Sequence, residues 1–255
     1  MADQSVHQRF GIREAAVRDS GREPTAIASA SPGRVRPMRV VIAGGHGKIA
    51  LRLERLLTSR GDEAVGIIRH PAQAADLTQY GARAVVLDLE RTDVDTLAAE
   101  LVGADAVVFA AGAGPGSGAA RKDTVDRAAA ELLAAAAEAA GVRRYVLISS
   151  MGASDDPPSG TDEVFAAYLR AKDASEKALR ESNLDWTILR PGRLTNQAGV
   201  GTVHLAPSVP RGNVSRDDVA AVLVALLDQP GTVGLTLEVV GGDVPIGDAV
   251  AAATE

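Results

Sequence analysis

The sequence of 255 residues contains no cysteine, which excludes disulfides, thiolate nucleophiles and zinc sites built from cysteine. Its four histidines, His7, His46, His70 and His204, are scattered without the spacing of metal ligands. Aromatic residues make up only 3%, so the core must consist mainly of alanine, valine, leucine and isoleucine. Such a core suits a parallel sheet covered by helices. We therefore expect an α/β protein without a metal centre.

Long apolar runs and excess positive charge are also lacking. No stretch of 18 apolar residues occurs, and residues 1–30 contain no continuous apolar segment of the kind that a secretory signal requires. The net charge of −6 works against nucleic acid or an anionic membrane as a partner, because neither polyanion attracts a net anion over long range. We expect a cytoplasmic protein with a small-molecule substrate, no nucleic-acid or membrane partner, and an oligomeric state that the sequence leaves open.

The first 37 residues mix polar, charged and proline residues without a sustained period, and we expect a flexible N-terminal extension there. Met38 directly precedes the first apolar run, so a start at Met38 is an alternative reading of this extension. From residue 38 to 255, strand-like runs alternate with helical patterns. The expected strands are 40–43, 64–69, 84–87, 106–110, 145–149, 186–189 and 235–240. This alternation predicts one Rossmann-type domain, a doubly wound parallel sheet with a small C-terminal extension on the substrate side.

Helical patterns separate the expected strands. They include 94–101, 121–140, 161–181 and a segment through Leu227 that begins with Ser215 and Asp218 in a capping-box-like pattern. The alanine-rich stretch 128–140 predicts close packing against the sheet, because small residues at helical spacing let a helix approach closely. We find no internal repeat of fixed period.

The strongest motif is the glycine-rich turn Gly44-Gly45-His46-Gly47-Lys48-Ile49-Ala50, which lies between the first expected strand and the first helix. Gly44 permits a sharp turn, Gly47 lets a pyrophosphate approach the backbone, and Ala50 keeps helix and strand close. The start of the helix also offers unpaired N–H groups to phosphate. The motif predicts a dinucleotide site, with a plain glycine-rich turn as the alternative. A Walker phosphate loop is excluded, because isoleucine and not serine or threonine follows Lys48.

The end of the second strand decides between the two nicotinamide dinucleotides. An acid there would bond the ribose hydroxyl of NAD, but Arg69 stands in this place. An arginine favours NADP(H) over NAD(H), because its guanidinium attracts the additional 2′-phosphate, with His70 as a helper. The alternative is an exposed arginine without a ligand. A second glycine-rich string, Gly114–Ala119, follows the fourth strand and not the first, so we expect it to form a mobile loop beside the cofactor.

Several segments continue the pattern begun by the glycine turn. They are Ala43–Ala50, Val86–Leu89, Phe109–Gly112, Ile148–Gly152, Tyr168–Lys172 and Trp186–Gly192. Taken in this order, they resemble the atypical short-chain dehydrogenase/reductase group, specifically the NmrA-like, NAD(P)H-binding proteins related to NAD(P)-dependent epimerases and dehydratases. The resemblance covers about residues 38–250. It implies the fold and the cofactor, whereas it says little about the substrate.

The resemblance also implies which residues bind the cofactor. Asp88 and Leu89 would border the adenine, residues 110–112 the ribose, and Pro191 with Gly192 and Leu194 the nicotinamide end. The complete expected set is Gly44, Gly45, His46, Gly47, Lys48, Ile49, Arg69, Asp88, Leu89, Ala110, Ala111, Gly112, Ser149, Lys172, Pro191, Gly192 and Leu194.

Tyr168 and Lys172 lie four residues apart on an expected helix, so their side chains share one face and can meet. A nearby ammonium favours the phenolate, which suits Tyr168 to exchange a proton with a carbonyl. Ser150, after the fifth strand, is placed to hold the substrate oxygen. This set looks like the Ser, Tyr and Lys set of the wider superfamily. Asp126 takes the place of its usual helical asparagine, which leaves the proton relay open, and a chance Tyr-x-x-x-Lys is the alternative.

Three functions compete. The first is an NADP-dependent oxidoreductase that acts on a small carbonyl, quinone or flavin-like acceptor, favoured by Ser150, Tyr168 and Lys172. The second is a redox sensor that binds the dinucleotide and regulates a partner without turnover, favoured by Asp126. A sugar-nucleotide epimerase or dehydratase ranks last, because only about 63 residues follow Gly192 and leave a small cap over the site.

Overall fold

The computed structural model describes residues 36–114 and 116–255. The expected flexible extension therefore lies outside the described residues, except for Arg36 and Pro37. Arg36 forms an exposed ion pair with Asp105, directly before the fourth strand. Among the residues that the structure describes, no helix combines the length and the apolar character needed to cross a membrane.

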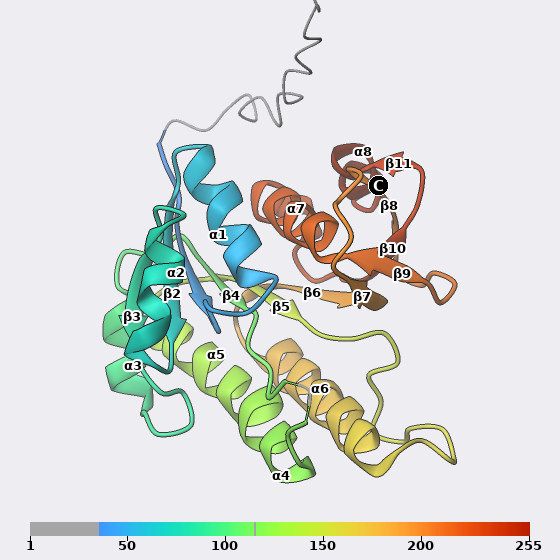
Figure 1. Ribbon diagram of the computed structural model, residues 1–255, viewed down its shortest axis with the longest axis horizontal. Helices are drawn as coiled ribbons and strands as arrows, with labels where there is room; N and C mark the ends of the chain where they lie inside the picture. Colours follow the sequence, from blue (N-terminus) through green and yellow to red (C-terminus); the bar gives the residue numbers. More distant parts are fainter. Residues whose placement is uncertain (1–35, 115) are drawn as a thin grey trace, which may run out of the picture. The chain divides into compact units, whose positions relative to one another are not determined.

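A mostly parallel sheet forms the centre of residues 36–255 (Figure 1). Its parallel part has the order β3-β2-β1-β4-β5-β6-β10, and the antiparallel strands β8 and β11 extend it beyond β10. The strands are β1 (Arg39–Ala43), β2 (Glu63–Ile68), β3 (Arg83–Val86), β4 (Ala106–Phe109), β5 (Arg144–Ile148), β6 (Asp185–Pro191), β8 (Thr202–Ala206), β10 (Thr236–Gly241) and β11 (Val244–Pro245). This order confirms the predicted doubly wound Rossmann-type sheet.

Helices cover both faces of this sheet. Its strands are therefore buried on both sides and have continuous apolar sequences, and β1 is an example. Val40 and Ile42 belong to the core under α1, α7 and α8, whereas Val41 and Ala43 belong to the core under α3, α5 and α6. The helices are α1 (Ala50–Ser59), α2 (Ala74–Thr78), α3 (Val94–Leu101), α4 (Ala119–Arg121), α5 (Ala129–Ala139), α6 (Glu163–Glu181), α7 (Arg216–Asp228) and α8 (Ile246–Ala252), with the short turns η1 (Pro71–Gln73) and η3 (Pro230–Thr232).

Local sequence explains where several helices begin, end and pack. Helix α1 ends before Gly61, whose positive φ of 86° suits glycine. Helix α7 is capped by Ser215, the residue before its first turn, whose hydroxyl accepts the amide hydrogen of Asp218. The alanines of α5 are mostly buried, in a core shared with α3, β4 and β5, as the alanine-rich pattern predicts. A π-helix, η2 (Lys122–Ala128), leads into α5, where the sequence predicts one continuous helix.

The C-terminal part contains more structure than the sequence predicts. Strand β7 (Arg193–Thr195) pairs with β9 (Asn213–Ser215) in a separate parallel pair. Strands β8 and β11 and helix α8 are the other unexpected elements. Strands β7, β9 and β11 have only two or three residues, too few to show an alternating pattern, so they give no signal in the sequence. Together these elements form the predicted extension after β6.

Candidate functional site

The glycine turn follows β1, at the point where β2 and β4 flank it on either side. Parallel sheets of this type bind ligands at the carboxyl ends of the strands where the strand order reverses, and Gly44 stands at that point. Gly44 has φ of 82°, and a Cβ there would lie 2.6 Å from Cα of Ala111. The amides of Gly44 and Gly45 both donate to the carbonyl of Ile67, at 3.2 and 2.9 Å. The turn therefore requires glycine for its conformation and for the approach of two neighbouring strands.

The start of α1 is built to receive an anion. Its N-cap residue, Ile49, has no polar side-chain atom with which to cap the first amides of the helix. A Cβ at Gly47 would lie 3.0 Å from the carbonyl oxygen of Gly44 and 3.6 Å from that of Ala110, so a larger residue would crowd the space in front of these amides. The residues present fit a dinucleotide pyrophosphate, which needs close backbone approach and unpaired amides.

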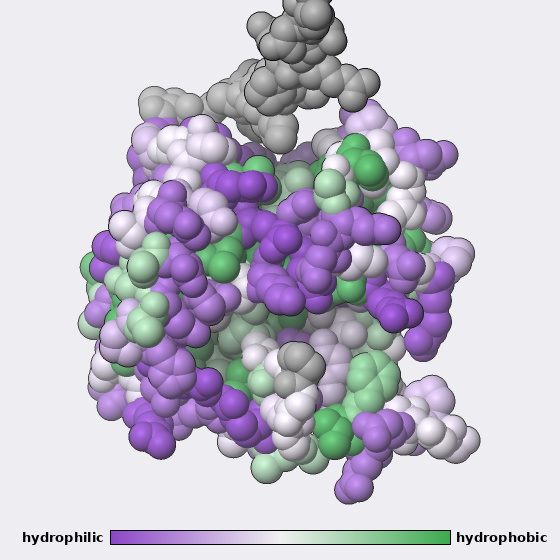
Figure 2. Space-filling model, viewed as in Figure 1, coloured by the Kyte–Doolittle hydropathy of each residue, from purple (hydrophilic) through white to green (hydrophobic). Residues whose placement is uncertain are grey.

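Two adjoining cavities run along the carboxyl ends of the strands, and Figure 2 shows the hollow on this face. Gly47 and residues 110–112 line both cavities. We call the first the adenosine cavity; its expected cofactor residues are Gly44, His46, Gly47, Arg69, Asp88, Leu89, Ala110, Ala111 and Gly112. We call the second the acceptor cavity; its expected cofactor residues are Gly47, Lys48, Ile49, Ala110, Ala111, Gly112, Ser149, Lys172, Pro191, Gly192 and Leu194.

Gly45 is the one expected cofactor residue that lines neither cavity in the described part of the chain. It is buried against β2, where a Cβ would lie 2.6 Å from Cα of Gly66. Its place in the structure is thus one of close packing between the turn and β2. The remaining members of the expected set lie together, although they come from segments up to 150 residues apart, from Gly44 to Leu194.

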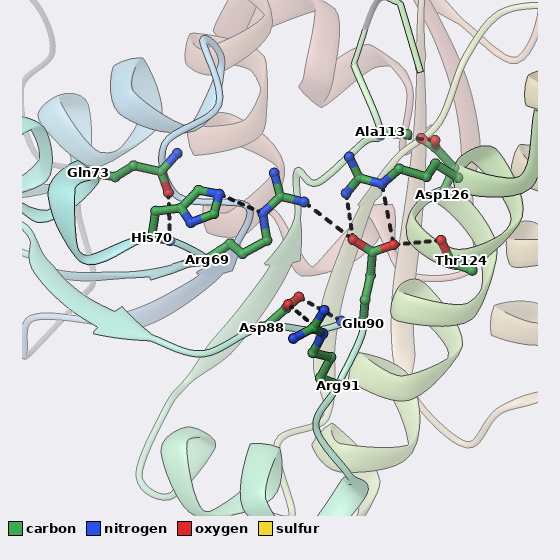
Figure 3. A network of polar contacts seen from close by, with 10 residues as sticks. Arg69, His70, Gln73, Asp88, Glu90, Arg91, Ala113, Thr124 and Asp126 are labelled. Carbon is green, nitrogen blue, oxygen red and sulfur yellow. Dashed lines mark hydrogen bonds and ion pairs between the residues drawn. The ribbon is translucent and has the colours of Figure 1, made fainter. Parts of the chain in front are cut away.

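At the outer end of the adenosine cavity lies a network of charged side chains (Figure 3). Nη1 of Arg69 is 3.4 Å from Oε2 of Glu90, and Nε of Arg69 donates to Nε2 of His70 at 3.1 Å. His70 therefore contacts Arg69, and its expected help in binding a phosphate stays a prediction. A second arginine, Arg121, contacts the same Glu90 carboxylate at 2.5 Å. Sequence reasoning missed both Glu90 and Arg121, because nothing in the local pattern links positions 31 residues apart.

The turn histidine has partners on both ring nitrogens. Nε2 of His46 lies 2.6 Å from a carboxylate oxygen of Asp76, and Nδ1 lies 3.1 Å from the amide nitrogen of Gln73. These contacts hold the ring beside α2 at the edge of the adenosine cavity. Lys48 is exposed and lines the acceptor cavity.

The acceptor cavity brings the expected catalytic residues together. Tyr168 and Lys172 project from α6, and Nζ of Lys172 lies 5.8 Å from the centre of the Tyr168 ring. Lys172 is 3% exposed; its ammonium donates to the carbonyl of Ile148 at 3.1 Å and lies 3.3 Å from Oδ1 of Asp126. Asp126 is 1% exposed and accepts the amide hydrogen of Ala113 at 3.1 Å. Lys172 is thus paired with the residue that replaces the usual asparagine.

A second ammonium, from Lys122, flanks the Tyr168 ring. Its Nζ lies 5.3 Å from the ring centre and donates to the carbonyl of Gly114 at 2.9 Å. Lys122 is 9% exposed and carries no ion pair with a carboxylate in the described residues. The π-helix η2 turns Lys122 and Asp126 inward together, and such helices are frequent at functional sites. Sequence reasoning missed Lys122, and its position before Asp126 on one helix was the available signal.

The two serines after β5 differ in their surroundings. Ser149 is buried, and its hydroxyl donates to Glu176 at 2.5 Å, so its side chain is engaged away from a ligand. Ser150 lines the acceptor cavity with a weak contact to the carbonyl of Met151 at 3.4 Å. Gly114 and Gly116 of the expected mobile loop line this cavity as well, while Pro115 lies outside the described residues.

Comparison with known proteins identifies the family of the chain. Residues 44–230 match the model of a family described as NAD(P)H-binding. The uncharacterized sugar epimerase YhfK of Bacillus subtilis is 36% identical over 84% of this chain and 99% of its own length. The NAD(P)H azoreductase of Xenophilus azovorans is 29% identical over 84% of this chain and 72% of its own length. A Bacillus halodurans structure, provisionally named an NAD-dependent epimerase/dehydratase, is 37% identical with a TM-score of 0.78, covering 84% of this chain and 99% of its own.

Proposed function

From the premise that this chain belongs to the NAD(P)H-binding family, we propose that it is an NADP-dependent reductase of a small carbonyl, quinone or flavin-like acceptor. The observation that carries the proposal is Tyr168, which lines the acceptor cavity together with Pro191 and Gly192. Two ammoniums, those of Lys122 and Lys172, lie 5.3 and 5.8 Å from its ring centre. A phenol in such a place is suited to give a proton to an acceptor oxygen. The name of the azoreductase relative supports reduction as the class of reaction.

Reduction of a carbonyl adds a hydride to carbon and a proton to oxygen, and the bound reduced dinucleotide would supply the hydride. The chain supplies the proton: Tyr168 donates from its hydroxyl, and the ammonium of Lys122, 5.3 Å from the ring centre, favours the negative charge that this leaves on the phenol. Lys172 is held by Asp126 and by the carbonyl of Ile148, which fixes its ammonium on the side of the acceptor cavity where Tyr168 lies. Ser150 is available to donate a hydrogen bond to the acceptor oxygen.

The preference for NADP(H) rests on Arg69. This guanidinium follows β2 and lines the adenosine cavity, where an acid would serve the ribose hydroxyl of NAD. The negative charge of the extra phosphate makes a charge-assisted, bidentate contact with arginine favourable. Because the chain lacks the acid at this position, NADP(H) is the better fit.

The test is turnover with purified protein, NADPH and a panel of aldehydes, quinones and flavins. With an active acceptor in hand, Tyr168→Phe should lower kcat by about a hundredfold or more, because it removes the proton donor while keeping the ring. The affinity for NADPH should change little. Tyr80→Phe is the matched control, since Tyr80 lies outside both cavities. Turnover at the wild-type rate in Tyr168→Phe would overturn the assignment.

A redox sensor without turnover is the second candidate, and one observation favours it. The ammonium of Lys172 is already paired with the buried carboxylate of Asp126, which differs from the asparagine expected of an active relay. If no acceptor in the panel oxidises NADPH, and NADPH and NADP+ change the protease sensitivity of the chain differently, the sensor replaces the reductase. An epimerase is the third candidate, supported only by the names of relatives.

For its location we propose the cytoplasm, on the sequence alone. The names of some relatives place them in chloroplasts, so the family is not confined to one compartment.

A further inference from the structure

Two arginine side chains from distant parts of the sequence meet at one carboxylate at the outer end of the adenosine cavity. Arg69 follows β2, Arg121 ends α4, and Glu90 follows β3. Oε2 of Glu90 accepts from both guanidiniums, at 3.4 Å from Arg69 and 2.5 Å from Arg121. Oε1 accepts from the hydroxyl of Thr124 at 2.7 Å (Figure 3). The carboxylate of Glu90 therefore holds the guanidiniums of Arg69 and Arg121 close together.

The guanidiniums keep capacity for another anion. The side chain of Arg69 is 42% exposed and that of Arg121 is 40% exposed, so both remain open to a ligand. Each guanidinium carries five N–H donors in a planar fork, and one shared carboxylate cannot occupy them all. A pair of such forks is the arrangement that recognises phosphate oxygens. Electrostatics and donor geometry thus both favour a phosphate group at this point.

The position of the pair within the fold decides which phosphate it meets. Both arginines line the adenosine cavity and also a continuation of it, which is lined by Arg69, His70, Asp88, Glu90, Arg91 and Arg121. In this type of sheet, the residue that follows the second strand faces the 2′ position of the adenosine ribose. The pyrophosphate belongs at the other end of this cavity, at the start of α1.

We propose that Arg121 is a second residue that binds the 2′-phosphate, and that Glu90 is an internal anion which competes with this phosphate for the two guanidiniums. The inference rests on the proposed preference for NADP(H) and adds the residues that determine how strong this preference is. Glu90 repels a phosphate by like charge, whereas it can accept a hydrogen bond from the 2′-hydroxyl of NAD(H). Arg121 thus favours NADP(H) and Glu90 favours NAD(H).

The hydrogen bond from Arg121 is the largest cause that holds the pKa of Glu90 below its usual range, with further help from Thr124. Glu90 is therefore ionised throughout the neutral range and competes at every working pH. Its carboxylate is only partly exposed, at 23%, so salt weakens the contact less than it would a fully exposed pair.

The experiment is calorimetric titration of the full chain with NADPH and NADH, and its readout is the ratio of the two dissociation constants. Arg121→Gln should reduce the preference for NADPH about tenfold or more, which is the size of one charge-assisted contact, with little change in NADH affinity. Glu90→Gln should increase the preference several-fold. Arg91→Gln is the matched control, because Arg91 lines the same continuation but its side chain is 85% exposed and contacts Asp88 instead of Glu90. Its ratio should stay at the wild-type value.

Two outcomes would contradict the inference. An Arg121→Gln variant that weakens both cofactors alike assigns Arg121 a structural role, and a Glu90→Gln variant with a reduced preference means that Glu90 positions the arginines. Either result overturns the inference and leaves the reductase proposal standing. Repeating the titrations with 2′,5′-ADP and 5′-AMP tests the adenosine end alone, where Arg121→Gln should weaken the binding of 2′,5′-ADP and leave that of 5′-AMP unchanged. Since no turnover is measured, failure to find an acceptor sinks the reductase proposal but not this one.

Discussion

At the scale of single residues, Glu54 is a buried carboxyl group whose pKa is raised. It lies on α1, is fully buried, and neither carboxylate oxygen has a hydrogen-bond partner in the described part of the chain. Its Oε1 fills the space that Cβ atoms on Gly45 and Gly66 would occupy. Burial raises the pKa of Glu54 to about 8, so the side chain is neutral in the folded protein at pH 7.

The raised pKa of Glu54 makes the free energy of unfolding depend on pH. Between the pKa of the unfolded chain, about 4.3, and the folded pKa of about 8, the unfolded chain releases a proton that the folded chain keeps. Stability therefore falls as pH rises through this window. Glu54→Met removes the ionisable group, so it should be more stable than wild type by about 2–4 kcal/mol at pH 8 and by much less at pH 5.

Thermal melts of wild type, Glu54→Met and the exposed control Glu181→Gln between pH 5 and pH 8 check this expectation. Parallel melting profiles for wild type and Glu54→Met across the whole range would contradict it.

Sequence patterns found those site residues that depend on short-range chemistry. The glycine turn, Arg69, and the Tyr168–Lys172 pair each follow from a spacing within a few residues or from the end of one strand. Arg121 could not be found in this way, and for Lys122 the one signal, its place four residues before Asp126, does not reveal its contact with Tyr168. Their roles depend on contacts with Glu90 and Tyr168, and the sheet brings these partners together only after the chain has folded.

At the scale of elements, α7 depends on its N-cap residue, Ser215. The Ser215 hydroxyl accepts the amide hydrogen of Asp218 at 2.9 Å and donates to the Asp218 carboxylate at 2.8 Å. That carboxylate in turn accepts the amides of Val200 and Gly201, which tie the loop before β8 to the helix. One buried cap thus fixes both the start of α7 and this loop.

Ser215→Ala should lower the free energy of unfolding by about 1–2 kcal/mol, because a helix cap is lost and the Asp218 carboxylate loses a donor in a buried place. Urea unfolding measures the change. Ser59→Ala at the exposed end of α1 is the control and should stay within about 0.5 kcal/mol of wild type. A Ser215→Ala variant as stable as this control would show that the cap contributes nothing.

Elements with a clear period were predictable and the others were not. The parallel strands are apolar runs bounded by turns, and each lies within about two residues of its expected range. The π-helix η2 has the same residue types as an α-helix, so its wider turn leaves no pattern in the sequence. The β7–β9 pair is held by tertiary pairing of three-residue strands, which propensity does not specify.

At the scale of the whole molecule, we predict that residues 1–37 are dispensable. Their composition cannot bury enough apolar surface to offset the entropy of ordering. The backbone amide of Met38 donates to Asp62 at 2.9 Å, a contact that a chain starting at Met38 keeps. A shortened chain that starts at Met38 should melt within a few degrees of the full chain and bind NADPH equally well. A clearly lower melting temperature or weaker binding would mean that the extension packs on the domain.

The charge of the molecule is distributed in a way that suits its ligand. The chain carries a net charge of −6, yet Lys48, Lys122, Arg121 and Arg69 all line the two cavities. Local cations of this kind attract a polyanionic dinucleotide into the site even though the whole surface repels anions. Binding should therefore weaken as salt is added.

The central claim is that the site prefers NADP(H) because Arg69 meets the 2′-phosphate. Calorimetric titration of wild type and Arg69→Ala with NADPH and NADH in one buffer tests it most directly. We predict that wild type binds NADPH more tightly, and that the variant loses about 1–3 kcal/mol of NADPH binding while NADH affinity hardly changes. Equal affinities of wild type for both dinucleotides, or an unchanged preference in Arg69→Ala, would contradict the claim.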